Sequence, residues 1–498
     1  MANSNQAANK LRPPLFLFLL PVFFVFHGYY ENFPVVPFPE SLLLTGIFII
    51  AGLVLYLLSC LLFRNKIAAA LLAFFILSFY FFFGALHDFL RTHDIILHKY
   101  SLLLPLFVLA TILLAVYLRK RKTFSRLPLF LNVLLLIYLL VDGIGLTLRA
   151  TGRTPSPVSS YTLAGTSTEP CDTCARPDIY FLLFDGYNAT RTLKDYYHYD
   201  NSGLDSFLIG EGFQIQKGSR SNYFATMFSM ASMLNLSYLK DLKDPQKIRP
   251  DDFTNLFEPI RNNEVMRFLA ARGYTIVNNS IFDLAGNPST IDQPFIPTKT
   301  KLITDRTLIN YLVRDMGKWF EQHFQDRRNQ GKRVYLTNLQ LLAQTIDESK
   351  RTSPKPRFVY THLLMPHFPH LFDSLQRRRD PMEVAREIEF LHPEPYLNYL
   401  PYTNARIREL IGAIKRNTGG KAVIIFMSDH GFRYYPKEGA DERTFFHNQN
   451  AIYFPDHDYR GFYDSISAVN EFRVLFNKMF RQRLPLLKDS TIFLKVRE

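Results

Sequence analysis

The chain has 498 residues and a net charge of +14, with 58 Lys and Arg against 44 Asp and Glu. Its length allows more than one domain, while three cysteines are too few for a fold that depends on a disulfide framework. The apolar residues are concentrated before residue 150, and part of the basic excess flanks these apolar segments, so the charge does not indicate nucleic-acid binding.

Five apolar segments before residue 150 approach the length of about 20 residues that a membrane-spanning helix needs. The first segment could in isolation be the apolar core of a signal peptide, but no small-residue cleavage site follows it, which favours an uncleaved helix. We therefore predict that residues 1–149 form a membrane domain with about five transmembrane helices. The segments lie near Pro14 to Tyr30, Leu42 to Phe63, Ile67 to Leu86, Leu102 to Leu118 and Leu127 to Leu148.

Basic residues are distributed unevenly among the connections between these segments. Lys10 and Arg12 precede the first segment and a basic run at 119–122 follows the fourth, whereas residues 31–40 contain no Lys or Arg. Because basic connections remain on the cytoplasmic side, we expect a multi-pass protein of the inner or plasma membrane with a cytoplasmic amino terminus. Everything after residue 150 is then extracytoplasmic.

Residues 150–177 are rich in Thr, Ser, Pro and Gly, which predicts an extracytoplasmic linker. Cys171 and Cys174 form a C-x-x-C pair in this stretch. Outside the membrane such a pair can form a local disulfide, and the flanking residues do not predict the strand and helix of a thioredoxin-like redox motif. A passive bridge and two free thiols both remain open.

Strand-like segments alternate with helical segments in residues 178–498, which predicts an α/β domain. The region from Thr307 to Ser349 is largely polar and helical, and we expect it to form a covering layer. The strand candidates are Asp178 to Phe184, Gly273 to Asn278, Arg357 to Leu364, Lys421 to Met427 and Asn450 to Phe454.

Acidic residues and a histidine follow two of the expected strands. Asp185 follows the first strand, and Asp429 and His430 follow the apolar run of residues 421–427. Ligands of open α/β sheets bind where such strands end, and a carboxylate beside an imidazole suits a divalent ion such as Zn²⁺ or Mn²⁺. The alternative is an Asp and a His that only solvate the end of a strand.

Residues 219–239 combine small and hydroxylated residues with Met and Phe at helical spacing. A helix that begins near Thr226 would bury its Met residues against the sheet. The Thr226 hydroxyl would then lie at a helix amino terminus, where backbone N–H groups and the helix dipole favour an anion. Taken alone, this position fits either an N-cap or a nucleophile.

With these residues the chain resembles the membrane-anchored branch of the alkaline phosphatase and sulfatase superfamily, which includes lipoteichoic acid synthases and lipid A phosphoethanolamine transferases. Asp185, Thr226, Asp429 and His430 occur in the order of that family's motif. The resemblance implies an N-terminal five-helix membrane domain plus a C-terminal α/β sulfatase-like (alkaline phosphatase-like) domain. It also implies one divalent metal ion, Zn or Mn, bound by these four residues, with Thr226 as the catalytic nucleophile.

Histidines of the stretch THLLMPHFPH resemble the substrate-contacting element of the family. By this resemblance His367 binds the transferred group, with His362 second, and His447 matches a histidine that precedes a late strand in relatives. The transferases have Glu where this chain has Asp185, which leaves transfer and hydrolysis open. The residues around Thr226 lack the Pro and Arg of the C/S-x-P-x-R motif, so sulfate-ester hydrolysis through formylglycine is not expected.

The function implied is that of a metal-dependent transferase. It would move a phosphoalcohol group from a membrane phospholipid donor to an envelope glycan or lipid acceptor through a phosphothreonine intermediate. The alternatives are an extracytoplasmic phosphodiesterase or phosphatase, and an inactive sulfatase-like regulator that binds lipid. No nucleic-acid partner is expected.

Overall fold

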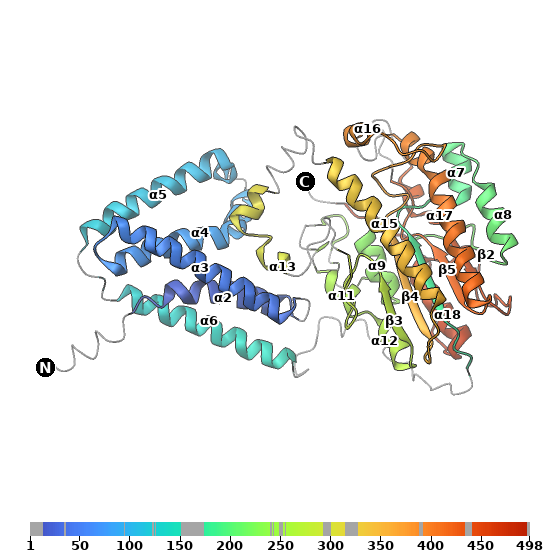
Figure 1. Ribbon diagram of the computed structural model, residues 1–498, viewed down its shortest axis with the longest axis horizontal. Helices are drawn as coiled ribbons and strands as arrows, with labels where there is room; N and C mark the ends of the chain where they lie inside the picture. The colour runs from blue at the N-terminus through green and yellow to red at the C-terminus, as the bar shows by residue number, and fades with distance from the viewer. Residues whose placement is uncertain are drawn as a thin grey trace. The chain divides into compact units, whose positions relative to one another are not determined.

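The structure is a computed structural model, and its chain is divided into two compact units (Figure 1). One unit comprises Met1–Ser156 and Phe295–Phe324, and the other comprises Pro157–Pro294 and Gln325–Glu498. Most of the expected linker, including Cys171, lies outside the residues that the structure describes. Cys174 is disulfide-bonded. The structure describes residues 13–33, 36–93, 95–121, 124, 126–150, 174–239, 242, 244–248, 252–253, 255–291, 300–313, 327–387, 392–433 and 441–495.

The first unit is a bundle of apolar helices in which α2 packs against α3, α4 and α6. Among the described residues, four helices are long and apolar enough to cross a membrane, and α2, with 16 residues, is a shorter apolar helix. The large apolar side chains of α3, α5 and α6 are mostly exposed, as expected for surfaces that face lipid. The bundle consists of α2 (Phe16–Glu31), α3 (Phe38–Leu62), α4 (Lys66–Thr92), the 3₁₀ helix η1 (Ile96–His98), α5 (Tyr100–Lys120) and α6 (Leu127–Ala150).

Residues 300–313, which contain α13 (Lys301–Thr304), also belong to the first unit. The Gly84 N–H donates to the Arg306 carbonyl at 2.9 Å, and the Tyr311 hydroxyl donates to the Asp88 carboxylate at 2.8 and 2.9 Å. This stretch overlaps the first part of the region from Thr307 to Ser349, which the sequence predicts to be one helical covering layer. Residues 308–313 are helical, α15 (Arg327–Lys350) is helical in the second unit, and residues 314–326 lie outside the described ranges.

The second unit is built on a mixed six-stranded sheet with the order β2-β6-β5-β1-β4-β3. Strands β3, β4, β1 and β5 are parallel, whereas β6 pairs antiparallel with β5, and β2 antiparallel with β6. All five expected strands are confirmed with shifts of one or two residues at their ends. The strands are β1 (Ile179–Phe184), β2 (Gln214–Ile215), β3 (Thr275–Asn279), β4 (Arg357–Leu363), β5 (Val423–Met427) and β6 (Asn450–Tyr453).

Helices cover both faces of this sheet, which explains why β1 and β5 are apolar and buried along their whole length. Tyr180, Leu182 and Phe184 of β1 belong to the core formed with α15 and α17, while Phe181 packs edge-on against Phe472 of α18 at 5.2 Å. The second unit thus has three layers, as Figure 1 shows. Its helices are α7 (Thr190–Tyr197), α8 (Ser202–Gly210), α9 (Thr226–Leu234), α11 (Phe257–Arg261), α12 (Glu264–Ala271), α15, α16 (Pro381–Arg386), α17 (Glu394–Thr418), the 3₁₀ helix η3 (Glu442–Phe446) and α18 (Ala468–Phe480).

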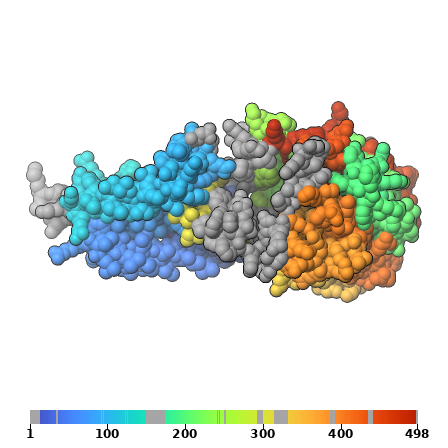
Figure 2. Space-filling model, turned by 90° about the horizontal axis from the view of Figure 1, so that it is seen from above, coloured from blue at the N-terminus to red at the C-terminus, as the bar shows by residue number. Residues whose placement is uncertain are grey.

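Figure 2 shows part of the outer surface of this unit, where α17, in orange, lies next to α7 and α8, in green. The guanidinium of Arg408 donates to the Gly203 carbonyl at 2.6 Å, and Asn404 donates to the Asn201 side chain at 2.8 Å. These contacts fix the segment that follows β1 against the helical layer. The carboxyl end of β1 lies beside that of β5 because the two strands pair in parallel.

Candidate active site

Three residues of types that commonly bind metal ions, Asp185, Asp429 and His430, lie together at the carboxyl ends of β1 and β5. The two strands are parallel neighbours, with Leu183 opposite Met427. Asp185 directly follows the last residues of β1, and Asp429 and His430 follow β5 after a single intervening serine. Because parallel strands present their carboxyl ends at one edge of a sheet, residues distant in sequence meet here.

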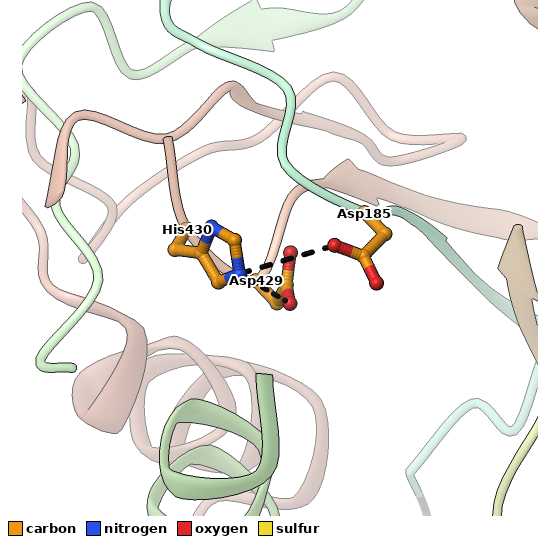
Figure 3. A group of neighbouring side chains, drawn as sticks. All are labelled: Asp185, Asp429 and His430. Carbon is orange, nitrogen blue, oxygen red and sulfur yellow. Dashed lines mark ion pairs between the residues drawn. The ribbon is translucent and has the colours of Figure 1, made fainter. Parts of the chain in front are cut away.

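The group formed by Asp185, Asp429 and His430 is fully buried, and one ligand atom from each residue lies within 4.8 Å of the others. His430 Nε2 is 3.3 Å from Asp429 Oδ2 and 3.9 Å from Asp185 Oδ1 (Figure 3). Both of these carboxylate oxygens are buried without a hydrogen-bond partner among the described residues. Two buried carboxylates beside an imidazole nitrogen form a donor set that fits a divalent cation.

His430 is held in the tautomer that a metal ligand requires. Its Nδ1 lies 2.8 Å from the Gly431 carbonyl, which can only accept a hydrogen bond, so Nδ1 carries the proton. Burial lowers the pKa of His430, against the opposing charge of Asp429, and thus favours the neutral ring. The Nε2 lone pair therefore points toward the two carboxylates.

The surroundings of Asp185 favour its charged form in spite of its burial. Burial alone would raise the pKa of this carboxyl. The charge of His367, followed by contributions from His362, outweighs burial and lowers the pKa well below its ordinary value. A carboxylate that stays charged in a dry site suits a cation that would neutralise it.

Thr226 is the first residue of α9, as expected, and it does not cap the helix. Ala225 occupies the N-cap position, and no side chain caps this end. The Thr226 hydroxyl lies 3.2 Å from His430 Nε2, and the residue as a whole is half-buried. Since His430 Nε2 has no proton in this tautomer, the hydroxyl is the donor.

The loop after β5 is held in place by hydroxyl groups and by close backbone packing. The Ser229 hydroxyl of α9 donates to the Asp429 carbonyl at 2.6 Å, and the Ser428 hydroxyl donates to the Tyr187 carbonyl at 2.5 Å. A methyl group on Gly431 would meet the Thr444 carbonyl oxygen at 2.6 Å. Glycine is therefore the residue that lets this turn pack closely enough to deliver its ligands.

Two of the expected substrate-binding histidines lie in or just after β4, on the other side of β1. His362 is wholly buried, with Nε2 3.6 Å from Asp185 Oδ2. His367 is half-buried, and its Nδ1 donates to the Phe368 carbonyl at 2.7 Å. Of the two, only His367 is partly open to solvent.

The third expected substrate-binding histidine, His447, contacts Thr192 and not Asp185. Its Nδ1 lies 2.9 Å from the Thr192 hydroxyl, and burial, followed by the charge of Arg220, lowers the pKa of its ring. Its backbone carbonyl lies close to Gly431 and accepts from the Ala189 N–H at 3.1 Å. His447 thus supports the turn through its main chain.

One residue beside the site, Tyr360, was not singled out by sequence analysis. It lies two positions before His362 on β4, and its hydroxyl is 3.0 Å from His362 Nδ1. The sequence alone could have indicated that Tyr360 and His362 are neighbours, because residues two apart in a strand point to the same face.

Most of the residues that match a known protein family lie in the second unit. Residues 221–465 match the family model described as Sulfatase. No curated protein sequence matches the chain. The matched range includes Thr226, His430 and His447, and Asp185 precedes it.

Several solved structures are similar to the chain at low sequence identity. The C-terminal periplasmic domain of EcEptC from Escherichia coli is 12% identical, with coverage of 66% of this chain and 88% of that chain and a TM-score of 0.38. The corresponding domain of the phosphoethanolamine transferase EptC from Campylobacter jejuni is 14% identical, with coverage of 65% and 95% and a TM-score of 0.36. A phosphonate monoester hydrolase of Agrobacterium radiobacter is 13% identical, with coverage of 64% and 77% and a TM-score of 0.38.

Proposed function

Because the chain belongs to the sulfatase-like alkaline phosphatase superfamily, we propose that it is a metal-dependent transferase that moves a phosphoalcohol group from a membrane phospholipid to an envelope acceptor. One observation carries the proposal. The hydroxyl of the half-buried Thr226 lies at a helix amino terminus 3.2 Å from His430, beside two buried carboxylates. An inactive sulfatase-like regulator would not need this complete set.

Thr226 is the nucleophile in this proposal. A free threonine hydroxyl is almost wholly protonated at neutral pH, and a divalent ion bound by Asp185, Asp429 and His430 would stabilise its alkoxide. Thr226 Oγ1 attacks the phosphorus, the bond from phosphorus to the lipid oxygen breaks, and that oxygen leaves with a proton as diacylglycerol. The phosphoalcohol group is then esterified to Thr226.

The surrounding residues assist this step with charge and hydrogen bonds. The α9 amino terminus directs backbone N–H groups toward the transferred phosphate. His367 is half-buried and close enough to Asp185 to lower its pKa, a position from which it can donate to a non-bridging oxygen or to the leaving group. An acceptor hydroxyl then attacks the phosphorus, and Thr226 recovers its proton.

The lipid donor is inferred from the membrane helices. Four helices of the first unit are long and apolar enough to span a bilayer. A catalytic domain tethered to such helices meets phospholipid head groups at a high effective concentration. Phospholipids are therefore the phosphodiesters that we expect it to use.

The test is an assay with a phospholipid pool that carries a label in its head group, incubated with the full-length protein, Zn²⁺ or Mn²⁺, and an envelope extract. Transfer places the label on a glycan or lipid acceptor. Label found only in soluble phosphoalcohol would instead indicate a hydrolase, in line with Asp185 where the transferases have Glu. If no label left the phospholipid, both the transferase and the hydrolase functions would be contradicted.

A further inference from the structure

The two oxygens of Asp185 face different histidines. Oδ1 lies 3.9 Å from His430 Nε2, within the candidate metal group, and has no hydrogen-bond partner among the described residues. Oδ2 lies 3.6 Å from His362 Nε2, and His362 is not part of the metal group. The carboxylate can therefore present Oδ1 to a cation while His362 faces Oδ2.

What His362 offers to Asp185 depends on where its ring carries the proton. A neutral imidazole has one N–H and one lone pair, and the partner of one nitrogen decides the role of the other. An N–H directed at Oδ2 attracts the carboxylate, whereas a lone pair at the same place repels it. The tautomer of His362 thus controls how Asp185 is held.

The Tyr360 hydroxyl selects the attractive tautomer. Tyr360 is 0% exposed, and within the described part of the chain its hydroxyl has a single recorded hydrogen bond, at 3.0 Å to His362 Nδ1. A buried O–H without an acceptor is unfavourable, so this hydroxyl donates and Nδ1 accepts. Nε2 then carries the proton and directs it at Asp185.

We propose that Tyr360 is a positioning residue for the metal centre, which acts by keeping the protonated Nε2 of His362 directed at Asp185, 3.6 Å from Oδ2. The proposal deepens the metal-dependent function proposed above and rests on it. Neither ring is free to turn, because Tyr360 stacks on Phe181 at 5.2 Å and His362 packs against Phe282 at 5.6 Å. Substitution of Tyr360 by Phe therefore removes the hydroxyl and leaves the packing.

The first experiment measures the affinity of the full-length protein for Zn²⁺ and for Mn²⁺ by competition with a chelator. Loss of a residue that orients a metal ligand costs 10- to 100-fold in affinity, so we expect Tyr360→Phe to weaken binding by about that factor. Tyr180→Phe is the matched control, since Tyr180 is also 0% exposed and its hydroxyl has no partner in the described residues. We expect the control to bind metal like the wild type.

The second experiment asks whether Tyr360 acts through His362. A glutamine at position 362 can place its amide N–H near the former Nε2 and does not depend on Tyr360. We expect His362→Gln to retain most of the metal affinity, and the added Tyr360→Phe change to cost less than threefold in that background.

Three outcomes decide the matter. Unchanged metal affinity in Tyr360→Phe would overturn the proposal. An equal loss of affinity in the wild-type and His362→Gln backgrounds would also overturn it, because Tyr360 would then not act through His362. A coupled loss would support it, even if the wild-type protein moved no phosphoalcohol group, in which case the proposed function alone would fail.

Discussion

At the scale of single residues, Thr226 illustrates how position decides chemistry. Sequence analysis left its hydroxyl as either a helix cap or a nucleophile, and the structure has Ala225 at the N-cap position and the Thr226 hydroxyl 3.2 Å from His430. A hydroxyl that capped α9 would be engaged with backbone N–H groups. Here it is directed at His430 instead, which fits the nucleophile role that we propose for it.

Glu471 is a second residue whose surroundings set its behaviour. It is 0% exposed on α18, and Asn450 of β6 donates to its Oε2 at 2.9 Å. Burial, opposed by this hydrogen bond, raises the pKa of the carboxyl from 4.5 to about 7. Between these two pKa values the folded protein thus retains a proton on Glu471 more readily than the unfolded chain does.

The raised pKa predicts a pH-dependent gain from Glu471→Gln. Between pH 4.5 and 7 the unfolded state binds fewer protons at this site than the folded state, so the contribution of Glu471 to stability falls as pH rises. Glutamine is neutral throughout, and the variant should gain on the order of 2–3 kcal/mol over the wild type between pH 4.5 and 8. Unfolding midpoints in detergent at both pH values provide the measurement.

The exposed Glu442 offers a matched control for this experiment. Glu442→Gln should show no such trend, because its carboxyl can remain hydrated in the folded protein. A stability difference between Glu471→Gln and the wild type that stays the same at both pH values would contradict the account of Glu471.

At the scale of elements, the turn that follows β5 positions Asp429 and His430, two of the proposed metal ligands. A methyl group on Gly431 would contact Asn188 Oδ1 and would approach the carbonyl oxygens of Thr444 at 2.6 Å and His447 at 2.9 Å. Two of these neighbours are backbone atoms that cannot yield without moving the chain. A larger residue at position 431 would therefore force the backbone of the turn to move, and the positions of Asp429 and His430 would change with it.

We expect Gly431→Ala to displace the ligands and to lower turnover by about 100-fold, since a shift of about 1 Å at a catalytic group has an effect of that size. Metal affinity measured by chelator competition should fall as well. Gly210→Ala is the control, because a Cβ at Gly210 meets nothing within 4 Å. If Gly431→Ala bound metal and turned over like the control, the proposed role of the turn would be wrong.

The elements that could be predicted from sequence are those with a strong local pattern. The apolar runs of β1 and β5 and the helical spacing after Thr226 are confirmed, and the strand ends explain why Asp185 and Asp429 were found. Strand β2 has only two residues, Gln214 and Ile215, and is too short to show any periodicity. The antiparallel direction of β6 likewise depends on tertiary pairing that no local pattern encodes.

Of the candidate site, only the three residues that could bind a metal ion were predictable from the sequence. Asp185, Asp429 and His430 stand out as charged groups at strand ends, and the structure brings them together. The contact between His362 and Asp185 arises from the pairing of β4 with β1, in which Leu183 lies opposite His362. Such neighbours become visible only once the strand order is known.

At the scale of the whole molecule, the two units differ in the surface that they expose. Large apolar side chains are exposed along α3, α5 and α6 of the first unit, whereas α/β layers enclose the core of the second. The assignment of Phe295–Phe324 to the first unit was not expected, because these residues lie between segments of the second unit in sequence. Contacts such as that of Tyr311 with Asp88 are long-range and leave no periodic trace.

The distribution of basic residues predicts the orientation of the protein in its membrane. The run at 119–122 should stay in the cytoplasm with the amino terminus, and the second unit should lie outside. In sealed right-side-out membrane vesicles, added protease should remove a carboxyl-terminal tag and spare an amino-terminal tag. Protection of the carboxyl-terminal tag together with loss of the other would reverse the predicted orientation.

The central claim is that the phosphoalcohol group is carried on Thr226, and mass spectrometry of the peptide that contains Thr226 tests it most directly. After incubation of the full-length protein with a phospholipid labelled in its head group and Zn²⁺ or Mn²⁺, we predict the mass of the phosphoalcohol group on Thr226, and its loss when an acceptor is added. Thr226→Ser should form the same adduct, and Thr226→Ala should form none while it still binds metal. Turnover by Thr226→Ala, or an adduct on another residue of that variant, would contradict the account.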